Sequence, residues 1–203
     1  MKVLNRLKPV GENPRYRLRI VVYGAALLMT CCQFFFTQLV YIPSLLHAEP
    51  WRLWTGHWVH LGAWHWGLNA IALVLLPEIF FQASSKIFLF LWFALPVLIS
   101  LLFFFFMPTL SLYAGLSGVL HGLYLVMALN AITSKNANER LMGWIVVLGL
   151  CLKVGWEFYS GNSQTAKLIG APVILQAHQY GAGLGFILWL FILVWKRMRH
   201  SSL

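Results

Sequence analysis

The chain has 203 residues, of which 60% are hydrophobic and only 10% are charged. This composition predicts a membrane-embedded bundle of helices. The formal net charge of +10 is best explained by membrane topology and contact with anionic lipid head groups. Nucleic acid is therefore not expected as a partner.

Long uncharged tracts predict where the chain crosses the membrane, because a spanning helix needs about 20 mostly apolar residues. Four such tracts lie at residues 20–48, 53–77, 87–134 and 168–195. The third is long enough for two helices and divides naturally at Met107-Pro108, because proline supplies no N–H and disfavours helix in the residue before it. A weaker span, Leu141 to Tyr159, carries Lys153 and Glu157 four residues apart, where they could pair near the interface.

These assignments predict an all-α membrane protein, with one domain over residues 1–203 that forms a compact bundle of six transmembrane helices. The expected spans are approximately 20–42, 57–81, 87–107, 112–133, 141–159 and 171–195. Loops rich in Lys and Arg face the cytoplasm. Three basic residues fall on one side of the predicted bundle, at Arg52, Lys153 and Lys167. The other twelve fall on the opposite side: Lys2, Arg6, Lys8, Arg15, Arg17, Arg19, Lys86, Lys135, Arg140, Lys196, Arg197 and Arg199. Both termini are therefore expected to be cytoplasmic.

Three of the expected spans carry polar side chains near their outer ends. Ser117 lies in Gly115-Leu116-Ser117-Gly118, His178 lies in the last span, and His65 and Asn69 lie in the second. With a helical rise of about 1.5 Å per residue, the serine and the two histidines fall within roughly 5 Å of one depth. Ionisable side chains are rare in hydrocarbon, and those found there usually mark functional sites.

Ser117 and His178 together predict catalysis by an activated serine. A hydroxyl becomes a good nucleophile when a base within hydrogen-bond reach takes its proton, and histidine titrates in the required range. A third, acidic member is not expected, because the chain has no Asp and its five Glu residues fall outside the spans or at their ends. The mechanism would be a dyad. Taken singly, Ser117 could instead bond to its own helix, and His178 or Asn69 could simply join two helices.

Glycine spacing favours the combined interpretation. Gly181-x3-Gly185 would let the last helix approach another helix closely, and Gly118-x3-Gly122 would offer a matching smooth surface. A hydrogen bond between Ser117 and His178 requires such an approach of the two backbones. The same glycines could also be ordinary packing residues.

In this order the motifs resemble those of the rhomboid family of intramembrane serine proteases. The resemblance covers nearly the whole chain and rests on four motifs: Trp51-Arg52, His60-x4-His65-x3-Asn69, Gly115-Leu116-Ser117-Gly118 and Ala177-His178-x2-Gly181-x3-Gly185. It implies a compact six-helix bundle with a water-filled cavity open to the outside. It also implies transmembrane protein substrates and membrane lipids as partners, with neither a cofactor nor a metal.

The resemblance further implies roles for individual residues. Ser117 would attack the scissile carbonyl, and His178 would act first as general base and then as general acid. His65, Asn69 and the backbone N–H of Ser117 would form the oxyanion hole. Supporting positions carried over in the same way are His60, Gly115, Gly118, Gly181 and Gly185, and His121 is a further supporting position that the usual pattern does not supply.

His121 departs from the usual pattern, because many rhomboids have a tyrosine four residues after the nucleophile. The string Gly-Leu-Ser-Gly-x-Leu-His-Gly that contains it resembles the bacterial rhombosortase subgroup. That subgroup implies an inner-membrane protein, open to the periplasm, that cleaves proteins with a C-terminal Gly-Gly motif, an apolar helix and a basic tail. His121 is expected to stack on His178 and to hold its tautomer through a hydrogen bond. Alternatively it is a packing residue bonded to a backbone carbonyl.

Three other functions remain open. A general rhomboid protease would cut other single-pass substrates. A transporter or proton channel would also place histidines across helices, although more often with acidic partners inside the spans. A non-proteolytic rhomboid-like binding protein would share the fold, but it would be expected to lack Ser117 or His178.

Overall fold

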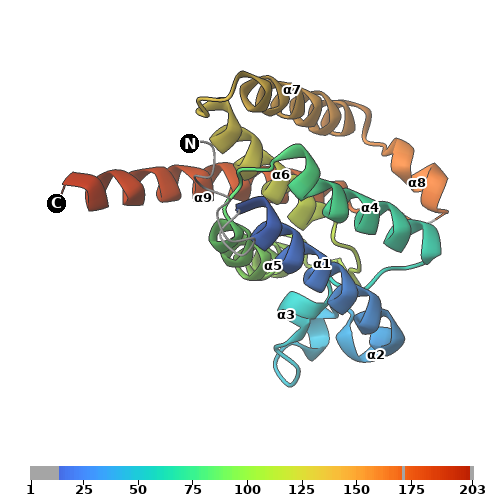
Figure 1. The fold of residues 1–203 in the computed structure, drawn as a ribbon. Helices are drawn as coiled ribbons and strands as arrows, with labels where there is room; N and C mark the ends of the chain where they lie inside the picture. Colours follow the sequence, from blue (N-terminus) through green and yellow to red (C-terminus); the bar gives the residue numbers. More distant parts are fainter. Residues whose placement is uncertain (1–13, 171, 202–203) are drawn as a thin grey trace, which may run out of the picture.

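The structure, a computed structural model, describes residues 14–170 and 172–201. The basic residues Lys2, Arg6 and Lys8, which the topology prediction uses, lie outside this part. Regular structure in the described part is helical, apart from one isolated bridge between Tyr41 and Tyr113. In chain order the elements are α1 (Pro14–Cys32), the 3-10 turn η2 (Gln33–Phe35), α2 (Phe36–Leu39), the 3-10 turn η3 (Pro43–Leu45), α3 (Arg52–Thr55), α4 (Ala63–Ile79), α5 (Ser85–Phe106), α6 (Ser117–Ile132), α7 (Ala137–Ser160), α8 (Gln164–Ile169) and α9 (Leu175–Ser201) (Figure 1).

Four described segments are long and apolar enough to cross a membrane: Arg15–Leu39, Ser85–Phe106, Ala137–Ser160 and Leu175–Arg199. α6 is apolar but shorter, and α4 has 17 residues. These helices fit an all-α membrane bundle. That the chain crosses the membrane six times, with α4 and α6 as the other two spans, remains a prediction.

Several helix boundaries differ from the expected spans. α5 ends at Phe106, just before Pro108, which agrees with the predicted division of the long apolar tract. Three helices begin later than expected: α4 at Ala63, α6 at Ser117 and α9 at Leu175, where starts near residues 57, 112 and 171 were predicted. Apolar composition does not distinguish a helix from a buried loop that leads into it, so the tracts overestimated the helices at these ends.

The segment before α6 is non-helical because its backbone bonds to the first loop. Tyr113 and Tyr41 exchange N–H···O bonds of 3.0 and 3.1 Å, and Gly115 N donates to Gly56 O at 3.2 Å. A Cβ atom on Gly56 would lie 2.5 Å from the Tyr41 Cβ, so only glycine fits this crossing. The first loop and the loop leading to Ser117 therefore pack as one unit.

The first loop is itself anchored by a buried arginine. Arg52, which is 4% exposed, donates to Val40 O at 2.6 Å and forms an ion pair with Glu49. The neighbouring Trp51 indole donates to Gln38 O at 3.1 Å. The Trp51-Arg52 pair is thus a structural clamp between α3 and the end of α2.

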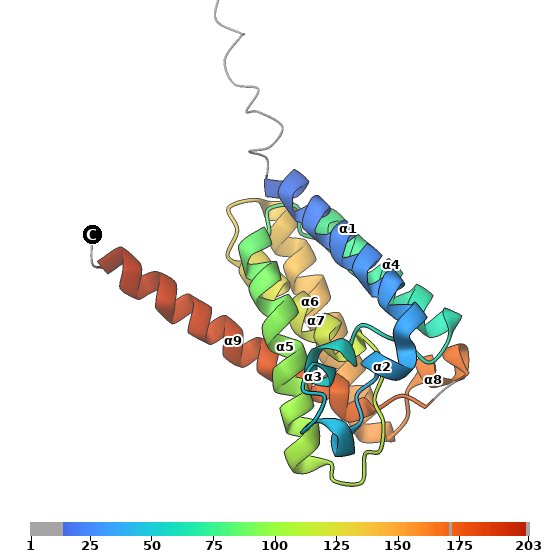
Figure 2. The same cartoon turned by 90° about the horizontal axis from the view of Figure 1, so that it is seen from below.

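α6 lies at the centre of the bundle, where it packs against α4, α5, α7 and α9 (Figure 2). Its closest neighbour is α9. A Cβ on Gly118 would lie 2.7 Å from Ala177 O, and one on Gly122 would lie 2.8 Å from Gly181 O. A Cβ on Gly181 would collide with the Gly118 carbonyl oxygen. The glycines therefore bring the starts of α6 and α9 into backbone contact.

The opposite end of the bundle holds the other turns. The start of α1, the α4–α5 connection and the α6–α7 connection lie together there (Figure 2). Arg15 and Arg19 of α1 each bind Glu78 at the end of α4, at 2.6 Å. Gln82 N donates to the buried carboxylate of Glu139 at 3.0 Å, which joins the α4–α5 turn to α7. These contacts fix the end of the molecule that is remote from Ser117.

Candidate active site

Ser117 is the first residue of α6. Gly115, two residues earlier, has φ +139°, a conformation that side chains disfavour, and a Cβ there would lie 2.7 Å from His65 Cε1. The N–H of Leu116 donates to His60 Nε2 at 3.3 Å. Ser117 therefore stands at the N-terminal end of α6. It does not lie about five residues into a helix that starts near residue 112, as predicted, because the preceding residues bond to the first loop.

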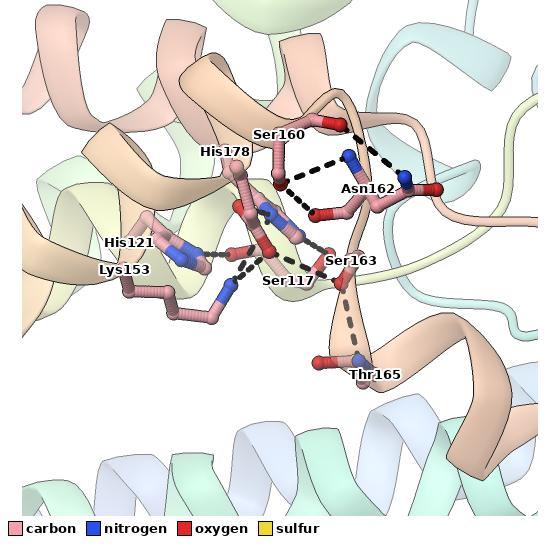
Figure 3. A network of polar contacts seen from close by, with 9 residues as sticks. Ser117, His121, Lys153, Ser160, Asn162, Ser163, Thr165 and His178 are labelled. Atoms are coloured by element: carbon pink, nitrogen blue, oxygen red, sulfur yellow. Dashed lines mark hydrogen bonds and ion pairs between the residues drawn. The ribbon is translucent and has the colours of Figure 1, made fainter.

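His178 lies in the first turn of α9 and is 2% exposed. Its Nε2 is 3.0 Å from the Ser117 Oγ (Figure 3). The contact spans the glycine-lined boundary of α6 and α9. The structure therefore brings together the two residues that the sequence paired, with the ring nitrogen and the hydroxyl at hydrogen-bond distance.

The other ring nitrogen of His178 meets a carboxylate. Its Nδ1 is 2.7 Å from Oε2 of Glu157, a residue of α7 that is 3% exposed. The expectation that no acidic group joins the site is wrong. Glu157 is one turn from the end of α7, but that turn lies beside α9, so the carboxylate is buried. Nearness to a span end in sequence does not determine which neighbour a side chain faces.

The other oxygen of that carboxylate, Oε1, accepts hydrogen bonds from two donors. Lys153 Nζ is 2.6 Å from Glu157 Oε1, and the Ser163 hydroxyl donates to the same oxygen at 3.1 Å (Figure 3). The predicted pairing of Lys153 with Glu157 is confirmed, but the pair lies beside His178. The i, i+4 spacing of the two charges was the available signal; it gave no indication of what the pair contacts.

Lys153 Nζ also lies 3.4 Å from His178 Nδ1. An ammonium group has only donors, and Nδ1 must carry a proton to bond to the Glu157 carboxylate. We therefore interpret this distance as charge proximity and assign the Nδ1 proton to Glu157. With the proton on Nδ1, a neutral His178 presents the lone pair of Nε2 to Ser117.

His121 lies one turn after Ser117 and stacks on His178. The ring centroids are 4.2 Å apart and the planes differ by 14°. The expected contact with the imidazole is observed, but the expected hydrogen bond to it is not. His121 Nδ1 instead donates to the Ser117 carbonyl oxygen at 2.7 Å. Both interpretations of His121, stacking and a bond to a backbone carbonyl, thus hold at once.

A cavity of about 230 Å³ opens beside these residues between α4, α6, α7, α8 and α9. Ser117, His121 and His178 line one wall, and His65 and Asn69 of α4 line another. The Asn69 amide donates to His65 O at 2.9 Å, one turn back in its own helix. The residues expected to form an oxyanion hole therefore share one cavity with Ser117.

His60 lies outside this cavity, in the loop before α4. Its ring stands perpendicular to that of His65, with centroids 4.9 Å apart. The carbonyl of His60 accepts a 2.6 Å bond from Gln33 Nε2. With its ring bonded to Leu116, it acts as a brace between the first loop and the segment that leads to Ser117.

His121, Glu157 and His178 could in principle hold a metal ion, since their donor atoms lie within 4.8 Å of one another. The two imidazole rings are nearly parallel, so their in-plane lone pairs do not converge. His178 Nε2 and Nδ1 both already have partners, in Ser117 and Glu157. A bound ion would have to break this arrangement, and the geometry fits proton transfer better.

Comparison with known protein families agrees with this arrangement. Residues 47–195 match the family model described as Rhomboid domain. The chain belongs to the rhomboid family. Rhomboids are generally intramembrane serine proteases, and with its several apolar helices this rhomboid is a multi-pass membrane protein. A comparison with individual curated proteins found no match.

Proposed function

We propose that this rhomboid is an intramembrane serine endopeptidase in which Ser117 is the nucleophile and His178 the general base. The observation that carries the proposal is the 3.0 Å contact between Ser117 Oγ and His178 Nε2 at the wall of a cavity. His178 takes the hydroxyl proton as the serine oxygen attacks the scissile carbonyl. It then gives that proton to the leaving amine as the peptide bond breaks.

The oxyanion formed by that attack needs hydrogen-bond donors. The N–H of Ser117 belongs to the first turn of α6, whose amides have no partner within the helix. The Asn69 amide faces the cavity and bonds only to a carbonyl of its own helix, a bond that it can give up. The buried Nδ1 of His65 finds no hydrogen-bond partner among the described residues, so it is available as the third donor. These three groups are the donors that the mechanism requires, and it requires no cofactor.

We infer that the protein lies in a bacterial inner membrane with both termini in the cytoplasm and the cavity open to the periplasm. The charge distribution supports this topology. Arg15 and Arg19 lie at the end of the bundle remote from Ser117, close to Glu78. Lys196 shares a pocket with the α4–α5 turn at that same end. Basic residues on that end would retain it on the cytoplasmic side.

We infer further that the substrates are transmembrane proteins with a C-terminal Gly-Gly motif, an apolar helix and a basic tail. The resemblance of the Gly115–Gly122 string to rhombosortases supports this choice. The cavity is compatible with such a substrate, because the apolar side chains of Leu150 and Ile169 line it together with Ser117. A helix containing Gly-Gly unwinds readily, since each glycine makes the helical state about 1 kcal/mol less stable than an alanine would.

A fluorophosphonate probe tests the activity before any substrate is known, because it labels only an activated serine. The detergent-solubilised wild type should be labelled, and Ser117→Ala and His178→Ala should not be. All three proteins should accumulate in the membrane to similar levels. Labelling of the Ser117→Ala variant at the wild-type rate would place the nucleophile elsewhere.

Co-expression with a tailed reporter tests the substrate class. A reporter that ends in Gly-Gly, an apolar helix and a basic tail should be shortened, while the same reporter with Leu-Leu should not. Equal cleavage of both would favour a general rhomboid protease.

A further inference from the structure

Glu157 is the one buried carboxylate beside the Ser117–His178 pair in the described chain. Its two oxygens have different partners. Oε1 accepts bonds from Lys153 Nζ at 2.6 Å and from the Ser163 hydroxyl at 3.1 Å. Oε2 faces His178 Nδ1 at 2.7 Å. Donors from α7 and from the loop after it thus hold Oε1 in place, and Oε2 is directed at the imidazole.

We propose that Glu157 is a positioning residue that completes a Ser117–His178–Glu157 triad. The inference rests on the proposed protease function and adds a third member to its mechanism. By accepting the Nδ1 proton, the carboxylate fixes the tautomer in which Nε2 is unprotonated and faces Ser117. It also holds the ring in the plane that this contact requires.

Attack by Ser117 and release of the amine do not require Glu157 to take up a proton. As Ser117 Oγ bonds to the carbonyl carbon, its proton moves to His178 Nε2 and the carbonyl electron pair moves to the oxygen. The imidazolium that forms keeps its Nδ1–H, and the ionised Glu157 stabilises it. When the tetrahedral intermediate collapses, the Nε2 proton goes to the departing amine.

Lys153 explains how a carboxylate can stay ionised at this depth. An unpaired buried carboxylate is costly to desolvate, and a cation in direct contact offsets that cost. The Lys153 side chain is 39% exposed, whereas that of Glu157 is 4% exposed. The Lys153 ammonium therefore remains partly solvated while the Glu157 carboxylate is buried. Glu157 can thus place its charge beside His178 while Lys153 offsets the cost of burying that charge.

Glu157→Gln tests the proposal because it keeps the shape of the side chain and changes its hydrogen-bonding character. Its amide can donate to Nδ1 and would then favour the tautomer with the proton on Nε2. The equivalent change in a serine protease triad lowers kcat by about 10⁴. We expect a fall in kcat of at least roughly 10²-fold with KM nearly unchanged, and a similar fall in the rate of fluorophosphonate labelling. Glu157→Asp should retain more activity than Glu157→Gln, because it keeps the charge.

Glu139→Gln is the matched control. Glu139 is also buried at 3% exposure in α7, but it binds Gln82 and Ser134 at the opposite end. Its amide variant should label and cleave like wild type even if its melting temperature falls. Activity of Glu157→Gln within threefold of wild type would overturn the triad. Equal loss in Glu139→Gln and Glu157→Gln, matched by equal unfolding, would make Glu157 structural only.

A spectroscopic measurement gives a readout that a structural role would not move. In protein labelled with ¹⁵N-histidine, the His178 Nδ1–H should give a strongly deshielded proton signal that Glu157→Gln abolishes and Glu139→Gln leaves unchanged. Loss of that signal without loss of labelling would contradict the inference alone. If the wild-type serine is never labelled, the protease proposal itself fails.

Discussion

The imidazole of His121 lies flat against that of His178, with centroids 4.2 Å apart, and its Nδ1 donates to the carbonyl oxygen of Ser117. One side chain thus touches both members of the Ser117–His178 pair. It supports the ring by stacking and fixes the first turn of α6 by the hydrogen bond. A substitution can therefore separate the two contributions.

We expect His121→Tyr to retain substantial activity, because a phenol ring can still stack on His178. His121→Leu should lower kcat by roughly three- to tenfold with little change in KM, because stacking contributes about 0.5–1.5 kcal/mol. Steady-state kinetics on the tailed reporter would measure both. Wild-type turnover in the leucine variant would show that the stack is dispensable.

Asn69→Ala should lower kcat by about 10²- to 10³-fold, the usual loss for one oxyanion donor. Stability should change little, because the amide bonds only to the His65 carbonyl of its own helix. Thermal unfolding and reporter cleavage measured on the same preparation would separate the two effects. A KM effect with unchanged kcat would instead assign Asn69 to substrate binding.

Gly181→Ala should destabilise the protein by about 1–3 kcal/mol, because the added methyl group collides with the Gly118 carbonyl oxygen. Activity should fall as well, since α6 and α9 must separate and Ser117 moves away from His178. Gly183→Ala is the control, because nothing lies within 4 Å of a Cβ there. That variant should be as stable as wild type or up to about 1 kcal/mol more stable. Equal behaviour of the two variants would show that the close approach is not needed.

Topology can be tested with single cysteines in a background where Cys31, Cys32 and Cys151 are replaced by serine. A cysteine at the exposed Asn162 should react with a membrane-impermeant maleimide in spheroplasts. A cysteine at the exposed Asn138 should react only after the membrane is opened. The reverse pattern would place the site on the cytoplasmic face.

Features encoded by local spacing could be predicted from the sequence. Gly118 and Gly181 could be paired across two helices because small residues every four positions mark a smooth helix face. The break after α5 could be found because proline acts on its own neighbourhood. Ser117 and His178 could be matched because few polar residues occur in such apolar tracts.

Features set by tertiary contacts could not be predicted. The start of α6 depends on bonds from Gly115 to Gly56, far away in sequence. Likewise, the direction in which Glu157 faces depends on how α7 lies against α9, which its i, i+4 spacing to Lys153 does not determine. Its position near the end of a predicted span made a solvated carboxylate the natural expectation, and only the packed structure shows it beside an imidazole.

The glycine-lined contact of α6 with α9 has a consequence for how the site responds to motion. Ser117 and His178 lie on α6 and α9, whose backbones are in direct contact. Glu157 lies near the C-terminal end of α7, whereas the close contact of α7 with α6 is at Gly143, near the N-terminal end of α7. The Ser117–His178 contact thus depends on the packing of α6 against α9, whereas the Glu157–His178 contact also depends on where the C-terminal half of α7 docks. A substitution that shifted this half of α7 would lengthen the Glu157–His178 contact before it disturbed the Ser117–His178 contact.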